Sequence, residues 1–325
     1  VVRPVCIGLR MTQSILSLLS VVALAGGAAA EVAYEFAPNF ITPPPGKETI
    51  GNGHGEIAVD SSGKIYVSVQ EANAGVQVYG TDGKFIKALP LPQSLHGFVV
   101  RKDGDGEFIF AAVLGEQKVI KCDLEGKVLM TIPTTEFPAE KVGKGLKLTN
   151  CDVAPNGDIY VVDGYGQSHI FVFSREGKFK AVFGGPGEPL KLANAHKIFI
   201  DRRFDPARVM ICDRGHKRLL HTDLDGKFIG EIATEMRNPS SASFHGDLMC
   251  VAEIAGNVSV WDKENKRVAD LGTAPKMTNT PKIEPKDWQQ GVVTSPHGIT
   301  FDNEGNILET EWNQWGRVLR WNRKK

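Results

Sequence analysis

Three histidines stand at the start of apolar segments, an unusual place for a titratable ring. They are His96 in "LHGFVV", His196 in "AHKIFI" and His297 in "PHGITF", spaced 100 and 101 residues apart. Three neutral imidazoles can hold Zn²⁺ and leave a fourth position for water or a substrate. Imidazole also suits Fe, Co, Mn or Cu. A repeat that tolerates a polar residue at each strand start would explain one such histidine, but three at equal spacing favour a metal site.

The segments that hold these histidines belong to a sixfold internal repeat. Each copy alternates apolar residues with turns rich in Gly, Asn and Asp, as in "CDVAPNGDIYVVDGYG", which is typical of short antiparallel strands. Four strands in a unit of roughly 40 residues form the blade of a β-propeller. The sequence therefore predicts an all-β fold, with a single six-bladed β-propeller domain over residues 31–325.

The last copy holds only three strands, and the segment "EVAYEFAPNF" at residues 31–40 has strand character. We expect this N-terminal segment to supply the fourth strand of the last blade. Closing the ring in this way removes two exposed sheet edges.

Alignment of the six copies on the innermost strand gives one equivalent ring position per blade. These positions are Gly55, His96, Cys151, His196, Ser240 and His297. Histidine occupies blades two, four and six, which lie roughly 120° apart around a six-bladed ring. Three imidazoles should therefore point at the central axis from three sides. His54, one position before the ring, is interpreted as a neighbour and not a ligand, and Cys151 as a small filler rather than a fourth ligand.

A second group of candidates follows the second strand of blades three and four, in "VVDGYGQS" and "ICDRGHKR". Tyr165 could serve as a general base or acid beside a metal, and Arg214 could bind a carboxylate. The acidic residues at these strand ends are predicted to stabilise turns: Asp163, Asp213, Glu253 and Glu311. The remaining histidines of the repeats are expected to be solvated: His169, His216, His221 and His245.

The segments "LHGFVV", "DGYGQSHI", "AHKIFI", "CDRGHKRL" and "PHGITFD" resemble the peptidyl-α-hydroxyglycine α-amidating lyase (peptidylamidoglycolate lyase) group of NHL-repeat six-bladed propellers. Members of that family hold zinc on three histidines in the channel. A tyrosine acts as base and arginines bind the substrate carboxylate. The reaction cleaves a carbinolamide to a peptide amide and glyoxylate. The resemblance implies His96, His196 and His297 as metal ligands, Tyr165 as the base and Arg214 as a substrate arginine.

Two departures from the family pattern bear on the substrate and on a second metal. The family has a further arginine after the second strand of blade one, where Val69, Gln70 and Glu71 stand here. Its structural calcium site uses an aspartate directly after the last histidine, where this chain has Gly298. The substrate can therefore differ, and a structural Ca²⁺ is not expected at that position.

Two other functions are compatible with the repeat. A non-catalytic NHL propeller would bind a protein, peptide or glycan on one face. A lactonase-like propeller would need a calcium site built from carboxylate and amide groups in the channel, where this chain has histidines. Between a metal-dependent lyase and these two, the three histidines favour the lyase.

The chain carries 38 basic and 38 acidic residues, and thus no formal net charge. A neutral balance argues against binding to nucleic acid or to an anionic membrane. We expect a monomer that acts on a small-molecule or peptide substrate in the channel.

Residues 11–30, "MTQSILSLLSVVALAGGAAA", have the features of a secretory signal peptide. Met11 is the expected start, residues 1–10 an upstream extension, and the mature protein begins near Glu31. We expect a periplasmic or secreted product without a membrane anchor. Export would permit disulfides, although buried free thiols are favoured for Cys122, Cys151, Cys212 and Cys250.

Overall fold

The computed structural model describes residues 1–2, 32–72, 74–143, 145–277 and 280–325. The chain divides into Val1–Glu31 and Val32–Lys325, and all the strands described belong to the second unit. The predicted start at Met11 and the predicted signal peptide lie outside the described residues. Among the described residues, no helix is long and apolar enough to cross a membrane.

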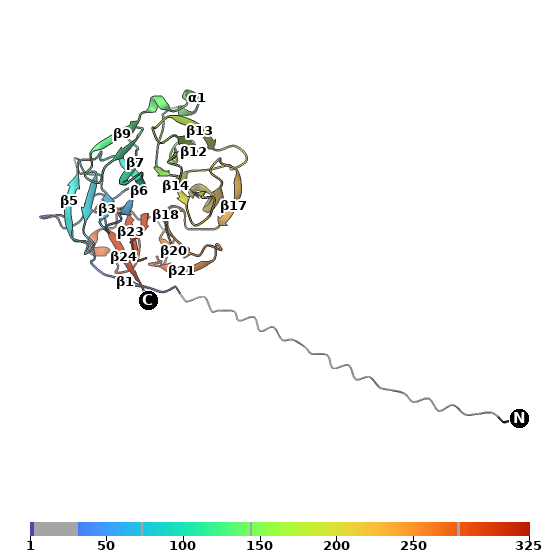
Figure 1. Ribbon diagram of the computed structural model, residues 1–325. Coiled ribbons are helices and arrows are strands. Elements are labelled where there is room, and N and C mark those ends of the chain that lie inside the picture. Colours follow the sequence, from blue (N-terminus) through green and yellow to red (C-terminus); the bar gives the residue numbers. More distant parts are fainter. Residues whose placement is uncertain (3–31, 73, 144, 278–279) are drawn as a thin grey trace. The chain divides into compact units, whose positions relative to one another are not determined.

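The unit Val32–Lys325 consists of six sheets, each of four antiparallel strands (Figure 1). Blade one holds β2 (Ile57–Val59), β3 (Ile65–Ser68), β4 (Val76–Tyr79) and β5 (Phe85–Leu89). Blade two holds β6 (Leu95–Asp103), β7 (Gly106–Val113), β8 (Lys118–Cys122) and β9 (Val128–Ile132). Blade three holds β10 (Asn150–Val153), β11 (Ile159–Val162), β12 (His169–Phe173) and β13 (Phe179–Gly184).

Blades four to six follow the same order from the axis to the rim. Blade four holds β14 (Ala195–Asp201), β15 (Arg208–Asp213), β16 (Arg218–Thr222) and β17 (Phe228–Ala233). Blade five holds β18 (Pro239–His245), β19 (Leu248–Glu253), β20 (Asn257–Trp261) and β21 (Arg267–Leu271). Blade six holds β22 (Pro296–Phe301), β23 (Ile307–Glu311), β24 (Val318–Arg323) and β1 (Tyr34–Ala37). The short helical segments are η1 (Thr134–Glu136), α1 (Ala139–Val142), η2 (Arg214–His216) and η3 (Pro285–Asp287).

The predicted closure of the ring is confirmed. Strand β1 pairs antiparallel with β24, with Tyr34 opposite Arg323 and Ala37 opposite Arg320. The blade thus joins the two ends of the domain, and β1 lies at the rim beside β24 in Figure 1. Pairing β1 with β24 covers an edge that would otherwise expose unpaired backbone groups.

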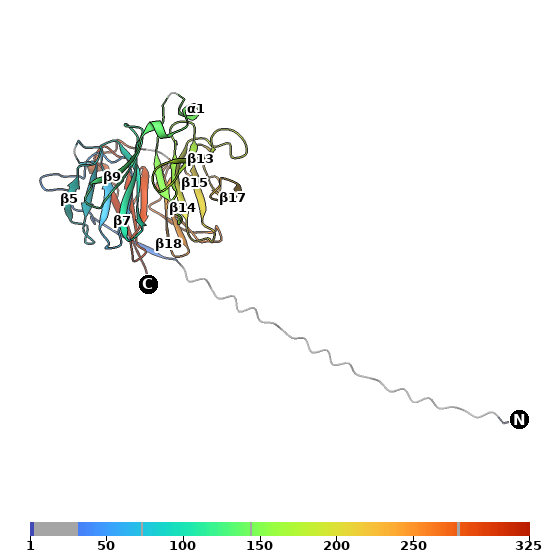
Figure 2. The ribbon, with the colours of Figure 1, turned by 45° about the horizontal axis from the view of Figure 1, so that its top comes forward.

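The innermost strands β2, β6, β10, β14, β18 and β22 each contact the next one around the axis, and β22 contacts β2. Figures 1 and 2 show β14 and β18 of this inner set nearer the middle of the ring than β5 and β17. Every residue of β14 is buried, whereas β5 at the rim alternates between half-buried and exposed residues before it ends at the buried Leu89. Neighbouring blades pack face to face, as where Tyr160 and Val162 of blade three meet Ile198 and Ile200 of blade four.

Four of the innermost strands carry a β-bulge at the ring position. The register with the second strand shifts at His96, His196, Ser240 and His297. A bulge leaves its extra residue unpaired and re-aims that side chain. The histidines therefore leave the alternating pattern of their strands, which allows each of them and the residue after it to face the axis.

The acidic residues at the ends of the second strands stabilise turns, as predicted. Asp163 accepts a hydrogen bond from the backbone N–H of Lys147 at 2.6 Å, and Asp213 accepts one from Ala193 at 2.9 Å. The equivalent acceptors are Glu253 for the N–H of Arg237 and Glu311 for that of Thr294. Each carboxylate holds the segment that leads into the innermost strand of its own blade, and so fixes where the ring position begins.

The prediction that the remaining histidines are solvated is wrong for two of them. His169 is 9% exposed and His221 is 2% exposed. His221 Nε2 lies 3.0 Å from Asp201, which also accepts hydrogen bonds from Arg203. The carboxylate of Asp201 gives the buried His221 ring a hydrogen-bond partner at Nε2, and Arg203 in turn neutralises that carboxylate. His216 is exposed, as expected, and His245 is half-buried against Phe301.

The four cysteines of the propeller are free and buried, in line with the interpretation favoured above. Burial raises the pKa of the thiols of Cys122, Cys151, Cys212 and Cys250. Protonated, enclosed thiols act as small apolar side chains.

Asp201→Asn is expected to destabilise the fold by about 3 kcal/mol near neutral pH, because Arg203 and His221 lose their buried partner. Burial raises the pKa of Asp201, but the hydrogen bonds from His221 and Arg203 outweigh it and lower the pKa from 3.8 to about 2. The stability contributed by this carboxylate is thus present above pH about 4 and lost as the pH falls through about 2. Urea unfolding measured across this pH range checks the prediction. The difference in the free energy of unfolding between wild type and Asp201→Asn should become smaller as the pH falls. A gap that stays constant contradicts the assignment, and Glu264→Gln, at an exposed glutamate, is the matched control.

Candidate metal centre

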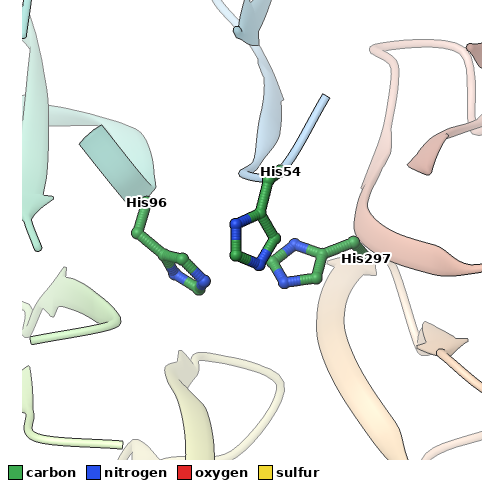
Figure 3. Close-up of side chains that lie close together, drawn as sticks. All are labelled: His54, His96 and His297. Atoms are coloured by element: carbon green, nitrogen blue, oxygen red, sulfur yellow. The ribbon is translucent and has the colours of Figure 1, made fainter. Parts of the chain in front are cut away.

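Four imidazoles and one phenol converge at the centre of the propeller. The ring centroids of His96, His196 and His297 lie 4.8 to 5.2 Å from one another. His54 joins them at 5.0 Å from His96 and 4.8 Å from His297. Figure 3 shows His54, His96 and His297 pointing toward one another from three ribbons. The predicted convergence of the three ring histidines is thus present in the structure.

Each ring histidine is oriented by the backbone of the next blade. The Nδ1 atom of His96 lies 2.8 Å from the carbonyl oxygen of Thr149, that of His196 2.7 Å from Ser240, and that of His297 2.7 Å from Gly55. A carbonyl oxygen can only accept, so Nδ1 carries the proton in all three rings. The three Nε2 atoms are therefore bare lone pairs aimed at the axis, the tautomer that a metal ligand needs.

The ring position of blade three differs from the sequence alignment. Thr149, and not Cys151, supplies the carbonyl that meets His96, and Cys151 lies in the apolar core with Val153 and Phe171. The alignment was wrong by two residues because Thr149 has no bulge or histidine to mark it. Gly55, Thr149 and Ser240 thus take part through their backbone oxygens.

Tyr165 points its hydroxyl at the bare nitrogens. The phenol oxygen lies 3.1 Å from His96 Nε2 and 3.0 Å from His196 Nε2. One O–H can donate to only one of these atoms. His297 Nε2 is buried and has no hydrogen-bond partner among the described residues. At least two buried acceptors thus lack a proton, and a divalent transition metal would satisfy them. The donor set fits Zn²⁺.

His54 enters the cluster, although the sequence analysis placed it outside the ligand set. One ligand atom each of His54, His96 and His297 lie within 4.8 Å of one another, so geometry alone admits His54. Its hydrogen bonds favour a different role. The Gln70 amide nitrogen lies 3.2 Å from His54 Nδ1, while Gln70 Oε1 accepts from Asn52. Nδ1 is therefore an acceptor, and the proton sits on Nε2, 3.4 Å from the Tyr165 hydroxyl.

Burial keeps all four rings neutral. It lowers the pKa of His96, His196 and His297 well below the usual range of histidine, and nearby cationic groups act in the same direction. Burial also lowers the pKa of His54 to about 4. Neutral imidazoles keep their lone pairs available at neutral pH. For Tyr165, burial raises the pKa of the phenol and the guanidinium of Arg214 opposes that rise.

Arg214 lies beside Tyr165, as its place in the sequence predicted. Its guanidinium carbon is 5.4 Å from the centre of the Tyr165 ring. In the amide orientation that satisfies both of its polar atoms, Asn194 accepts a hydrogen bond from Arg214 at 3.1 Å. Among the described residues, Arg214 forms no ion pair with a carboxylate, whereas Arg218 nearby pairs with Asp213. Arg214 is thus able to receive a carboxylate from a ligand.

A pocket of about 430 Å³ opens over the histidines. Its lining combines the polar site with a short apolar wall: His54, Tyr165, Arg214, Asn238, Ile254, Ala255 and Trp312. The Trp312 ring stands 5.3 Å from that of His54. The sequence analysis named His54 as a neighbour of the ring, and it missed Trp312 and Gln70 as parts of the site. The signal for His54 was the run "NGHGE", in which His54 precedes a ring position that glycine leaves open.

Comparison with known proteins identifies the fold class of this chain. The sequence model of a family described as a 6-bladed beta-propeller (DUF5128) matches residues 151–269. The structure of a streptogramin B lyase covers 90% of this chain and 98% of its own, with a TM-score of 0.58 and 15% identity. A virginiamycin B lyase from Staphylococcus aureus covers 90% and 88%, with a TM-score of 0.53 and 16% identity. At these identities the likeness concerns the fold alone: the chain is a six-bladed β-propeller.

One curated protein is similar to this chain in sequence over part of its length. A Caenorhabditis elegans protein named as a probable peptidyl-alpha-hydroxyglycine alpha-amidating lyase is 28% identical over 128 residues. The match covers 38% of this chain and 35% of the relative, so it spans about a third of that protein's length.

Proposed function

We propose that this protein is an exported, metal-dependent lyase that uses His96, His196 and His297 as zinc ligands. The proposal is carried by three bare imidazole nitrogens on rings whose centroids lie 4.8 to 5.2 Å apart, to which only the Tyr165 hydroxyl offers a proton among the described residues. The partial similarity to an amidating lyase supports the choice of reaction. The substrate class is an N-acyl-α-hydroxyglycine, a carbinolamide with a free carboxylate.

The chemistry requires one proton to move from oxygen to nitrogen. The O–H bond of the carbinol and its C–N bond break, while a C=O bond and an N–H bond form, so that the products are an amide and glyoxylate. A zinc ion, when bound, supplies a Lewis acid that makes the hydroxyl proton easier to remove. In its phenolate form, which a cation bound beside it would favour, Tyr165 would accept that proton and return it to the leaving nitrogen.

Arg214 and the apolar part of the pocket lining can bind the two ends of such a substrate, its carboxylate and its acyl group. The guanidinium of Arg214, which has no carboxylate partner among the described residues, can bind the substrate carboxylate. Trp312, Ile254 and Ala255 offer apolar surface to the acyl side. Val69, Gln70 and Glu71 stand at the blade-one position where the family has an arginine, and Gln70 binds His54. A neutral imidazole therefore borders the substrate where the family has a second positive charge.

The test measures metal content and product together. Purified protein should contain about one zinc per chain and release glyoxylate from an N-acyl-α-hydroxyglycine. Removal of the metal should abolish this release, and added Zn²⁺ should restore it. A folded protein that neither holds nor binds a transition metal contradicts the proposal and favours a propeller that acts as a binding scaffold. Metal binding without glyoxylate release would support the proposed metal centre and contradict the proposed substrate class.

A further inference from the structure

A second layer of side chains lies directly below the histidines. Each innermost strand contributes the residue after its ring position: Glu56, Gly97, Asn150, Lys197, Ser241 and Gly298. Two of the six are glycines, and one is a lysine in a strand that is otherwise apolar apart from His196 and its last residue. The bulge at His196 lets both His196 and Lys197 face the axis. This layer therefore holds a cation at the centre of the propeller.

Lys197 is fully buried and surrounded by oxygen. Its ammonium lies 2.9 Å from Glu56 Oε2, 3.2 Å from the carbonyl oxygen of Gly55 and 3.2 Å from that of His297. The side chain has no solvent exposure. Burial lowers the pKa of Lys197, and the carboxylate of Glu56 opposes that shift. One carboxylate and two backbone carbonyls are also the ligand types that a Ca²⁺ ion takes.

Glu56 ties three blades to this cation. Its Oε1 accepts from the backbone N–H of Ile57 at 3.1 Å and of Ile299 at 2.9 Å. Its Oε2 accepts from the hydroxyl of Ser241 at 2.8 Å. With Lys197 from blade four, the carboxylate joins blades one, four, five and six. A buried charge pair with all its polar atoms satisfied is costly to break by removing one partner.

The calcium site that the family resemblance implies does not fit this arrangement. A Cβ atom at Gly298 would lie 2.6 Å from Glu56 Oε1 and 2.8 Å from Glu56 Cα. No side chain larger than hydrogen fits there, so an aspartate after the last histidine is excluded while Glu56 keeps its place. The carbonyl oxygen of His297 is already bound to Lys197.

We infer that Lys197 is a covalently attached replacement for a structural divalent cation: its ammonium occupies a cation site formed by Glu56, Gly55 O and His297 O. The inference goes beyond the proposed function and does not depend on it. It has one consequence for the histidines. Gly55 O accepts from both Lys197 Nζ and His297 Nδ1, so Lys197 is also a positioning residue for His297.

The test asks whether Ca²⁺ can replace the ammonium. Lys197→Ala leaves the three oxygen groups in place and Glu56 without a counter-charge, which should lower the Tm on the order of 10 °C. Millimolar CaCl₂ should restore at least half of that loss, and MgCl₂ less, because Mg²⁺ demands a stricter geometry. Wild type, held at constant zinc, should show no shift with Ca²⁺. Glu56 lies in the lining of a pocket with Ile57 and Phe98, and we expect the ion to enter there.

Two variants complete the design. The double variant Lys197→Ala with Glu56→Gln should have a higher Tm than Lys197→Ala alone, because no uncompensated carboxylate remains. Its Tm should not change when Ca²⁺ is added. Lys266→Ala, at an exposed lysine, should match wild type under all conditions. If Lys197→Ala does not fold unaided, refolding with and without CaCl₂ decides: recovery only with Ca²⁺ supports the inference, and recovery in neither overturns it.

Three results contradict the replacement: a folded Lys197→Ala without a Ca²⁺ response, a Ca²⁺ response retained when Glu56 is also changed, or an equal Ca²⁺ shift in wild type. Zinc content measured on the same samples distinguishes the failure of this inference from the failure of the proposed zinc-dependent function. A wild type that binds no zinc while Lys197→Ala responds to Ca²⁺ would reject the proposed function and leave this inference standing.

Discussion

His196→Ala is expected to abolish stoichiometric zinc binding and, with it, glyoxylate release. The substitution removes one of three bare nitrogens, and the remaining pair leaves the ion two protein ligands where three hold it. Loss of a group that only orients a ligand costs about 10–100-fold in metal affinity, and loss of a ligand should cost more. Metal analysis after gel filtration, together with the glyoxylate assay, measures both effects.

His245→Ala is the matched control for this experiment, since His245 is half-buried far along β18 and packs on Phe301. It should retain about one zinc per chain and full activity. His196→Ala should keep the circular dichroism spectrum of wild type, because the ring makes one hydrogen bond to the backbone, at Ser240, and its other contacts are with side chains of the cluster. Full zinc occupancy in His196→Ala would show that the metal sits elsewhere, with His54 as the first residue to test.

Tyr165→Phe is expected to reduce the rate of glyoxylate release by about 10²–10⁴-fold while zinc binding stays intact. Tyr165 carries the hydroxyl that lies within hydrogen-bond reach of both His96 Nε2 and His196 Nε2. Phenylalanine keeps the ring and its contacts with both imidazoles. Tyr165→Phe should therefore lower kcat and leave the zinc content unchanged.

Tyr34→Phe controls for the removal of a hydroxyl. The Tyr34 hydroxyl donates to Gly305 O in blade six, away from the site. Unchanged activity in both variants would remove Tyr165 from the reaction. Loss of zinc in Tyr165→Phe would instead give the phenol a role in holding the metal. Steady-state kinetics on zinc-saturated proteins separate these results.

The amino-acid sequence alone determined the blade count, the ring closure and the three converging histidines. These features repeat at a fixed interval, and strand alternation makes a repeated residue face the same way in each copy. The turn-forming acids Asp163, Asp213, Glu253 and Glu311 were predictable for the same reason. Tyr165 and Arg214 were found through their place at the ends of equivalent strands.

Only the tertiary structure decided the features that depend on contacts between blades. His54 reaches the cluster with its Nδ1 bound by Gln70, which follows the second strand of blade one, and its Nε2 facing Tyr165. The ring position of blade three is Thr149, which acts through a carbonyl that no side-chain pattern reveals. Burial of His221 requires Asp201 and Arg203 around it. Lys197 meets Glu56 across 141 residues of chain, and the charge pair at the axis exists only because the ring closes.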